Sequence, residues 1–315
     1  MAALKRVALV RLDALGDTLL TTPAVAMLRE YASDCEVLAL THPAGTAVLR
    51  PLCAVMEVTP KASWRELAAY LRDFQPDAVI CCSEKRRATL ASWASAAPLR
   101  VGFNPGWAQP LKALASGWFF HRMTPANPDL HETQRYARLV ELALERSDLE
   151  VPPIQLQPLP NHYRAARAWA APLGVQLTPK WCRFGYTIQH LRQWLERLPQ
   201  PWLGLTGPAE EEWARRHFPD INLYCSGDLF EYAAVVEGLR VLVTIDTGAA
   251  HVAAARGVAT VDVFPEQNHQ HCVPRWRPWR CRHEIVLQPA FSAESVQRIG
   301  AELRGAVDRL WNAPE

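Results

Sequence analysis

The residues that most constrain the fold run from position 7 to position 23, where an apolar strand leads into a Gly-Asp turn and then a helix. Val7 to Val10 are four apolar residues in a row, which is typical of a parallel strand covered on both faces. Polar residues begin at Arg11, at the carboxyl end of this strand. Because doubly wound sheets bind ligands beyond the carboxyl ends of their strands, we expect a ligand site here.

The second half of the chain contains a junction of the same kind. Val241 to Ile245 form an apolar strand, and a helix is expected to open at Asp246 and to continue to about Arg256. Strand-like runs recur at 7–12, 36–41, 77–82, 100–103, 202–206, 221–225, 241–245 and 258–264. Helical patterns lie between them, at 24–31, 64–74, 131–145, 210–218, 230–237 and 247–256. This alternation predicts an α/β protein with two doubly wound, Rossmann-like parallel sheets.

A proline-rich segment separates the two halves. Residues 151–160 contain four prolines, so this segment cannot form a helix or a central strand. Residues 292–311 begin with a serine cap and carry apolar residues at helical spacing, which predicts a long amphipathic helix. We therefore expect a first domain at 1–155, a second at 156–291 and a C-terminal helix at 292–315.

Composition narrows the class of protein. The 315 residues are 49% hydrophobic, which is enough for two buried cores. With 34 basic and 32 acidic residues the net charge is +2, so the chain lacks the basic excess of a nucleic-acid-binding protein and we expect no nucleic-acid partner. No apolar run approaches the ~18 residues that cross a bilayer, and the first residues lack a signal-peptide core. We expect a cytoplasmic protein.

The cysteines and histidines raise the question of a metal site. None of the eight cysteines forms a Cys-x-x-Cys pair, so we expect reduced thiols. One stretch nevertheless offers five possible zinc ligands, namely His269, His271, Cys272, Cys281 and His283. Their spacing matches no common zinc pattern. It favours a loop whose His and Arg side chains meet a phosphate, an acceptor or water, and we assign no metal.

Several motifs of the two halves occur in the order found in one enzyme family. They are Arg-Leu-Asp-x-x-Gly-Asp-x-x-x-Thr-Thr-Pro-Ala at 11–24, Arg-Val-Gly-Phe at 100–103, His-Glu-x-x-Arg-Tyr at 131–136 and Asp-Thr-Gly-x-x-His at 246–251. On these motifs the chain resembles glycosyltransferase family 9, which includes the bacterial ADP-heptose:lipopolysaccharide heptosyltransferases. The resemblance spans roughly residues 7 to 264.

The resemblance carries expectations about fold and activity. It implies two Rossmann-like domains that face an interdomain cleft, the GT-B arrangement, with the C-terminal helix packing back toward the first domain. It also implies an inverting transfer of heptose from ADP-heptose to a hydroxyl of a lipopolysaccharide-core or other cell-envelope glycan. A lipid-linked acceptor would place the reaction at the inner face of the cell membrane, with peripheral membrane contact at most. The aromatic residues within 107–122 suit either such contact or core packing.

Inverting transfer needs a base for the acceptor hydroxyl, and the first junction offers one. Asp17 follows Gly16, which lets a ligand approach the backbone closely. The resemblance implies that Asp17 is the base, whereas the residues alone allow it to be a helix N-cap. We give Asp13 a supporting role, and Arg11 either binds an anion or pairs with one of these carboxylates. Thr18 adds a hydroxyl near the turn.

Three basic residues lie on the acceptor side. The expected strand at 77–82 is followed by Lys85, Arg86 and Arg87. These residues either bind phosphates or carboxylates of the acceptor, or form a solvated charged surface.

The second junction suits the diphosphate of a nucleotide sugar. Thr247, Gly248 and Ala249 lie where the free N–H groups and the positive dipole end of a helix bind anions. His251 lies one turn later and Asp246 directly before, and we include both in the donor site. The alternative is a capped helix with a buried, hydrogen-bonded histidine.

The donor side includes one candidate cation, and the sequence there differs in part from the family's pattern. Lys180 precedes Trp181 as a lysine does in the family, which makes it a candidate phosphate ligand. No Asp-x-Asp occurs in the chain, so we expect transfer without a metal ion or other cofactor. Residues 265–268 replace the family's Gly-Pro-Thr or Gly-Pro-Ser turn. Residues 275–280 alternate arginine with tryptophan, which suits a sugar phosphate, the apolar–polar boundary of a lipid-linked acceptor, or a loop that packs its own tryptophans.

Two other functions fit the same expected architecture. One is a nucleotide-sugar epimerase or hydrolase, because a fold does not determine its chemistry. The other is a non-catalytic nucleotide-sugar-binding protein, which would bind the donor without turnover.

Overall fold

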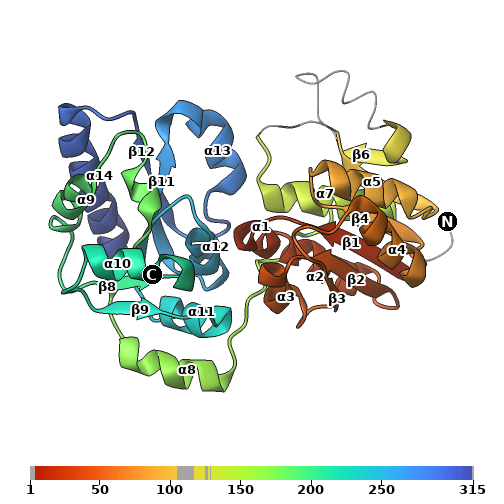
Figure 1. Cartoon of the computed structure of the whole chain (residues 1–315), viewed down its shortest axis with the longest axis horizontal. Coiled ribbons are helices and arrows are strands. Elements are labelled where there is room, and N and C mark those ends of the chain that lie inside the picture. Colours follow the sequence, from red (N-terminus) through yellow and green to blue (C-terminus); the bar gives the residue numbers. More distant parts are fainter. Residues whose placement is uncertain (1–3, 105–116, 125–126, 128, 314–315) are drawn as a thin grey trace. The chain divides into compact units, whose positions relative to one another are not determined.

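The structure is a computed structural model that describes residues 4–104, 117–124, 127 and 129–313. The chain divides into two compact units, Met1–Gln155 and Leu156–Glu315 (Figure 1). Each unit is built on a parallel sheet covered by helices. The two doubly wound sheets confirm the expected fold class.

In the first unit, the described residues form a six-stranded sheet of order β3-β2-β1-β4-β5-β6. Its strands are β1 (Arg6–Arg11), β2 (Glu36–Thr41), β3 (Ala54–Glu57), β4 (Ala78–Cys81), β5 (Leu99–Phe103) and β6 (Arg122–Thr124). Its helices are α1 (Leu15–Leu19), α2 (Thr22–Tyr31), α3 (Pro43–Leu49), α4 (Trp64–Phe74), α5 (Arg86–Ala94) and α7 (Glu132–Leu144). The apolar run Val7 to Val10 is completely buried, as a central strand requires.

In the second unit, the described sheet also has six strands, in the order β12-β11-β10-β7-β8-β9. The strands are β7 (Leu173–Gln176), β8 (Leu203–Thr206), β9 (Leu223–Cys225), β10 (Val241–Ile245), β11 (Ala259–Pro265) and β12 (His283–Gln288). The helices are α8 (Pro160–Ala166), α9 (Ile188–Leu195), α10 (Glu211–His217), α11 (Leu229–Glu237), α12 (Gly248–Ala255), α13 (His269–Trp276) and α14 (Ala293–Asn312). Counted along the chain, both sheets have strand order 3-2-1-4-5-6, the doubly wound arrangement.

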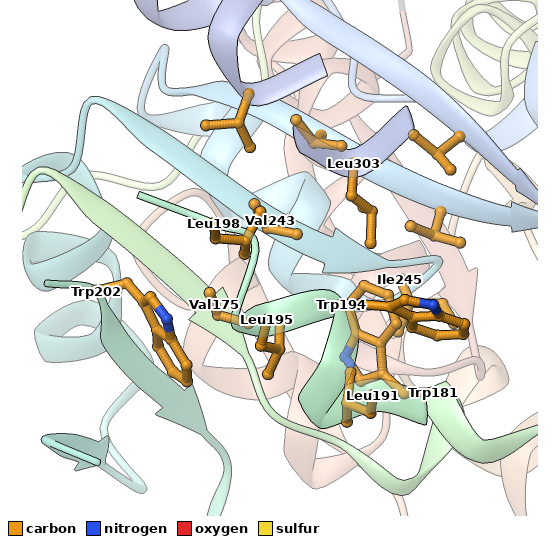
Figure 2. Close-up of a cluster of buried hydrophobic side chains, with 14 of the residues drawn as sticks. Val175, Trp181, Leu191, Trp194, Leu195, Leu198, Trp202, Val243, Ile245 and Leu303 are labelled. Atoms are coloured by element: carbon orange, nitrogen blue, oxygen red, sulfur yellow. The ribbon is translucent and has the colours of Figure 1, made fainter. Parts of the chain in front are cut away.

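The core of the second unit lies between its sheet and the helices α9 and α14 (Figure 2). Trp181 and Trp194 are almost completely buried, with ring centroids 6.4 Å apart. Each indole N–H donates to a backbone carbonyl, Trp181 to Gln176 at 2.7 Å and Trp194 to Val296 at 2.8 Å. Because the polar atoms are satisfied, both rings can be buried at little polar cost. This packing fixes the carboxyl end of β7 and the segment that follows it.

Several expectations can be compared with the elements. Residues 151–159 contain no helix or strand, as their prolines predict, and α8 begins at Pro160, where proline is tolerated. The loop expected at 269–276 is wrong, because these residues form α13 with Pro274 inside it. The helix α14 packs on β12, β11, β10 and α9 of its own unit, and its expected packing toward the first domain stays a prediction.

Some expectations concern the protein surface and the cysteines. Of the aromatic segment 107–122, Trp118 is 80% exposed and Phe120 is buried, while residues up to 116 lie outside the described part. All eight cysteines are free thiols. Within the described ranges, no helix combines the length and apolar character needed to span a membrane.

Candidate functional site

Polar side chains gather at the switch point of each sheet, where the strand order reverses. In the first unit this point lies between β1 and β4, and in the second it lies between β7 and β10. In doubly wound proteins the loops after such paired strands diverge to opposite faces, and ligands bind beyond the carboxyl ends of the strands. The predicted site residues of each half lie at the end of these strands, on the loops after them or on the helices that follow.

A buried guanidinium organises the site of the first unit. Arg11 ends β1, and its side chain is only 4% exposed. Its Nη2 lies 3.2 Å from Asp17 Oδ1, and its Nη1 lies 3.5 Å from Asp13 Oδ2 and donates to the carbonyl of Cys82 after β4. The predicted pairing of Arg11 with carboxylates is therefore present, and it links the two strands of the switch point.

The charge on Arg11 is stable in this setting. Burial opposes it, but the facing groups, which include Asp13 and Asp17, favour it, and the net effect raises the pKa of Arg11 above its usual value. The guanidinium also lies 4.9 Å from the ring centre of Tyr136, a cation–π distance. Burial raises the pKa of Tyr136 well above its usual range, so this phenol is neutral at pH 7.

Asp17 does not cap the helix that carries it. The N-cap of α1 is Ala14, which makes no side-chain capping bond, and Asp17 lies in the first turn. Its side chain is 32% exposed, so a substrate can reach a carboxylate that the buried Arg11 holds. Thr18 is fully buried, and its hydroxyl donates to Ala14 O at 3.1 Å, so it braces the helix.

The three basic residues after β4 have different surroundings. Lys85 is the N-cap residue of α5, and its Nζ lies 3.4 Å from Asp13 Oδ1 and donates to the carbonyl of Leu12. Arg86 is exposed. Arg87 donates to Ala62 O at 3.2 Å and contacts the ring of His42 at 2.8 Å, so it holds a neighbouring loop. The structure therefore brings only Lys85 into the Arg11 cluster.

Residues of the 131–136 motif extend this cluster, and sequence reasoning had given them no role. Arg135 stacks over Phe103 with 4.4 Å to the ring centre and pairs with Glu84 at 2.8 Å and with the buried Glu132. Phe103 in turn packs against Tyr136, with centroids 5.9 Å apart. The sequence feature that pointed to these residues was the His-Glu-x-x-Arg-Tyr motif, whose residues all lie on the first turns of α7 or at its cap.

In the second unit, the turn after β10 has an unusual backbone. Asp246 has a φ of 22°, in the left-handed range that disfavours residues with a Cβ. Thr247 is the N-cap of α12, and its Oγ1 accepts from Ala249 N at 3.3 Å and lies 3.0 Å from Thr244 Oγ1. The helix start predicted from the sequence is present. The N–H of Ala249 is already bonded, contrary to the expectation that it is free for a phosphate.

Lys180 crosses the switch point of this unit. It lies in the short 3-10 helix Pro179–Cys182 after β7, and its Nζ donates to Asp246 O at 2.9 Å. Burial raises the pKa of Asp246, and the nearby cations Lys180 and Arg183 oppose that rise. A lysine and a helix N-terminus therefore lie together, which is a suitable environment for a phosphate.

The remaining candidates have simpler placements. His251 is 6% exposed on α12, so its side chain is buried, and its place in the donor site stays a prediction. The ring of His269 bonds to Glu266 O at 2.6 Å and that of His283 to Cys281 O at 2.9 Å. Among the residues that the structure describes, no three His, Cys, Asp or Glu side chains are grouped so that they could hold a metal ion.

Comparisons with known proteins bear on both halves. Residues 205–303 match the model of glycosyltransferase family 9 (heptosyltransferase). The resemblance to this family is confirmed. No curated protein matches the chain in sequence.

Solved structures of similar fold span nearly the whole chain. A glycosyl transferase family 9 protein from Veillonella parvula has a TM-score of 0.76 at 17% identity, over 97% of each chain. E. coli heptosyltransferase WaaC with ADP has a TM-score of 0.66 at 19% identity, over 95% of this chain and 99% of that one. E. coli ADP-heptose lps heptosyltransferase II has a TM-score of 0.69 at 12% identity, over 97% and 99%. At these identities the likeness shows the fold, and with the family match it supports a glycosyltransferase.

Proposed function

We propose that this chain is an inverting, metal-independent glycosyltransferase that moves heptose from ADP-heptose to a hydroxyl of a lipopolysaccharide-core or other lipid-linked cell-envelope glycan. The observation that carries the proposal is the partly exposed Asp17 carboxylate, held 3.2 Å from a buried, permanently charged Arg11. The donor is suggested by the ADP of the WaaC structure and by the name of heptosyltransferase II. We assign the acceptor to the first unit, the donor to the second, and the reaction to the cytoplasmic face of the membrane.

In this mechanism, the Asp17 carboxylate takes the proton of the acceptor hydroxyl as its oxygen attacks the anomeric carbon of the sugar. The bond from that carbon to the diphosphate oxygen breaks, and its electron pair leaves with the nucleoside diphosphate. Because attack and departure occur on opposite faces, the configuration inverts. Lys180 and the N-terminus of α12 carry the positive charge that the departing diphosphate needs. These protein groups, and the lack of an Asp-x-Asp in the sequence, support transfer without a metal ion.

The first test separates the base from donor binding. We expect Asp17→Asn to lose about 10²- to 10⁴-fold in transfer rate, the usual worth of a positioned base, with an unchanged Kd for ADP. Asp34→Asn, at an exposed position after α2, serves as the control and keeps full activity. An Asp17→Asn enzyme that folds and transfers at the wild-type rate contradicts the proposal.

The donor is identified by thermal unfolding with ADP, ADP-heptose, UDP-sugars, GDP-sugars and NAD. A ligand at one hundred times its Kd adds about 2.7 kcal/mol of stability, which is a measurable shift. We expect ADP and ADP-heptose alone to stabilise the wild type and Lys180→Ala to abolish the effect. Stabilisation by another nucleotide alone refutes the donor assignment. Release of free or epimerised sugar without an acceptor favours an epimerase or hydrolase, and binding without turnover favours a non-catalytic protein.

A further inference from the structure

A carboxyl group is completely buried in the sheet of the second unit. Asp262 lies in the middle of β11, beside Thr244 of β10, and has no solvent exposure. Its strand neighbours Val261 and Val263 belong to the hydrophobic core, and an apolar residue would suit a central parallel strand better. Burying a carboxyl costs free energy unless its hydrogen bonds compensate. The contacts of Asp262 should therefore explain its presence.

One oxygen of Asp262 holds the turn after the neighbouring strand. Its Oδ1 accepts from the backbone N–H of Asp246 at 2.7 Å. Asp246 is the residue with φ of 22°, a conformation that costs free energy in any residue but glycine. The surrounding structure has to enforce such a backbone, and the bond from β11 is a direct means of doing so.

The turn in its constrained form serves the donor site. The carbonyl of Asp246 accepts from Lys180 Nζ at 2.9 Å, and the next residue, Thr247, caps α12. We propose that Asp262 is a positioning residue for the donor diphosphate, which acts by holding the Asp246 peptide so that Lys180 and the start of α12 point to one place. This inference rests on the proposed function and concerns a residue outside the motifs that carry it.

The chemical form of Asp262 suggests which variants to make. Burial, and then the neighbouring Asp246, raise the pKa of Asp262 well above its usual value, so the neutral acid is favoured. Within the described part of the chain, its Oδ2 is buried without a hydrogen-bond partner. Asparagine has the shape of the neutral acid and keeps an oxygen for the Asp246 N–H, whereas leucine has the same branching and the same number of side-chain heavy atoms but no acceptor. The pair Asp262→Asn and Asp262→Leu therefore isolates the hydrogen bond.

The binding test uses ADP as the probe and full-length protein. We expect Asp262→Leu to raise the Kd for ADP about tenfold or more, the consequence of a buried N–H that loses its acceptor, and Asp262→Asn to remain within about threefold of the wild type. In a Lys180→Ala background Asp262→Leu should add little, because both changes remove the same positioning. Hydrogen exchange of the peptide covering 244–250, without ligand, should accelerate in Asp262→Leu and not in Asp262→Asn.

A matched control is Thr260→Val. Thr260 is on the same face of β11, fully buried, and its hydroxyl donates to Val258 O rather than to the turn. It should leave the Kd for ADP unchanged. Three results would each overturn the inference and leave the proposed function standing: equal Kd values for ADP in Asp262→Leu and the wild type, additive losses of ADP affinity in the double variant, and unchanged hydrogen exchange at 244–250. A wild type that binds no nucleoside diphosphate overturns both.

Discussion

The buried guanidinium of Arg11 allows a quantitative test of how the first site is held together. Arg11→Met removes the charge and keeps most of the apolar stem, so it leaves Asp17 and Asp13 without their shared cation. Breaking a buried ion pair by removing one partner costs about 3–5 kcal/mol. Asp17 is about one-third exposed and Asp13 keeps Lys85 at 3.4 Å, so we expect the lower end, about 3 kcal/mol.

The assay is urea unfolding of the full chain at pH 7, analysed for separate transitions of the two units. In thermal unfolding of the same variants, at about 2–4 °C per kcal/mol for a unit of this size, the melting temperature of the first unit should fall by roughly 6–12 °C. Arg65→Met is the control, because Arg65 is exposed and stacks on the neighbouring Trp64, so its loss should cost no more than about 1 kcal/mol.

A second variant tests the cause of the loss. Adding Asp17→Asn to Arg11→Met removes the unpaired charge, so part of the lost stability should return even though another group has been mutated. Two results would refute the view that Arg11 neutralises this carboxylate. One is a free energy of unfolding of Arg11→Met within about 1 kcal/mol of the wild type, and the other is a double variant less stable than Arg11→Met alone.

Two further perturbations test the surroundings of this site. Burial, and then Arg87, lower the pKa of His42, so the unfolded chain binds more protons and wild-type stability should fall as pH drops from about 7 to 5. In urea unfolding between pH 5 and 8, the free energy of unfolding of His42→Gln should fall less with decreasing pH than that of the wild type. The same pH dependence in both proteins would refute this. A Cβ on Gly102 would lie 2.5 Å from the Phe120 ring, so Gly102→Ala should cost about 1–3 kcal/mol, whereas Gly117→Ala, which meets nothing within 4 Å, should not. Equal melting temperatures of the two alanine variants contradict the packing argument.

The central strands could be predicted because their apolar runs are unbroken. Glu36–Thr41 and Val241–Ile245 have the predicted bounds, since each is bounded by polar or small residues that end the hydrophobic pattern. The first strand of the second sheet, β7, was missed because it has four residues and includes Gly174, which weakens a strand pattern. The helix α13 was missed because Pro274 and clustered histidines are typical of loops. Tertiary packing determines the secondary structure of such segments, and the local sequence pattern does not predict it.

The site could be predicted in part for a related reason. A residue at a strand–helix junction, such as Asp17 or Thr247, is marked by the change of pattern around it. Asp262 lies within a strand run, and its role depends on the pairing of β10 with β11, which places its carboxyl beside the Asp246 N–H. The sequence does not say which of Lys85 and Arg87 joins the site. The difference depends on the position of the loop that Arg87 contacts through Ala62 O.

The two units use one device for different chemistry. At each switch point a lysine from one strand-end loop donates to a backbone carbonyl of the other, Lys85 to Leu12 and Lys180 to Asp246. The reason is shared, because loops that diverge at this point leave carbonyls that the sheet cannot satisfy. The charges then differ. Lys85 also pairs with Asp13 in a cluster that contains the predicted base, whereas within the described residues Lys180 forms no ion pair. A lysine whose charge is already shared stabilises carboxylates, and a lysine held only by a carbonyl retains its charge for a phosphate. In the function we propose, the same fold therefore serves proton removal in the first unit and diphosphate binding in the second.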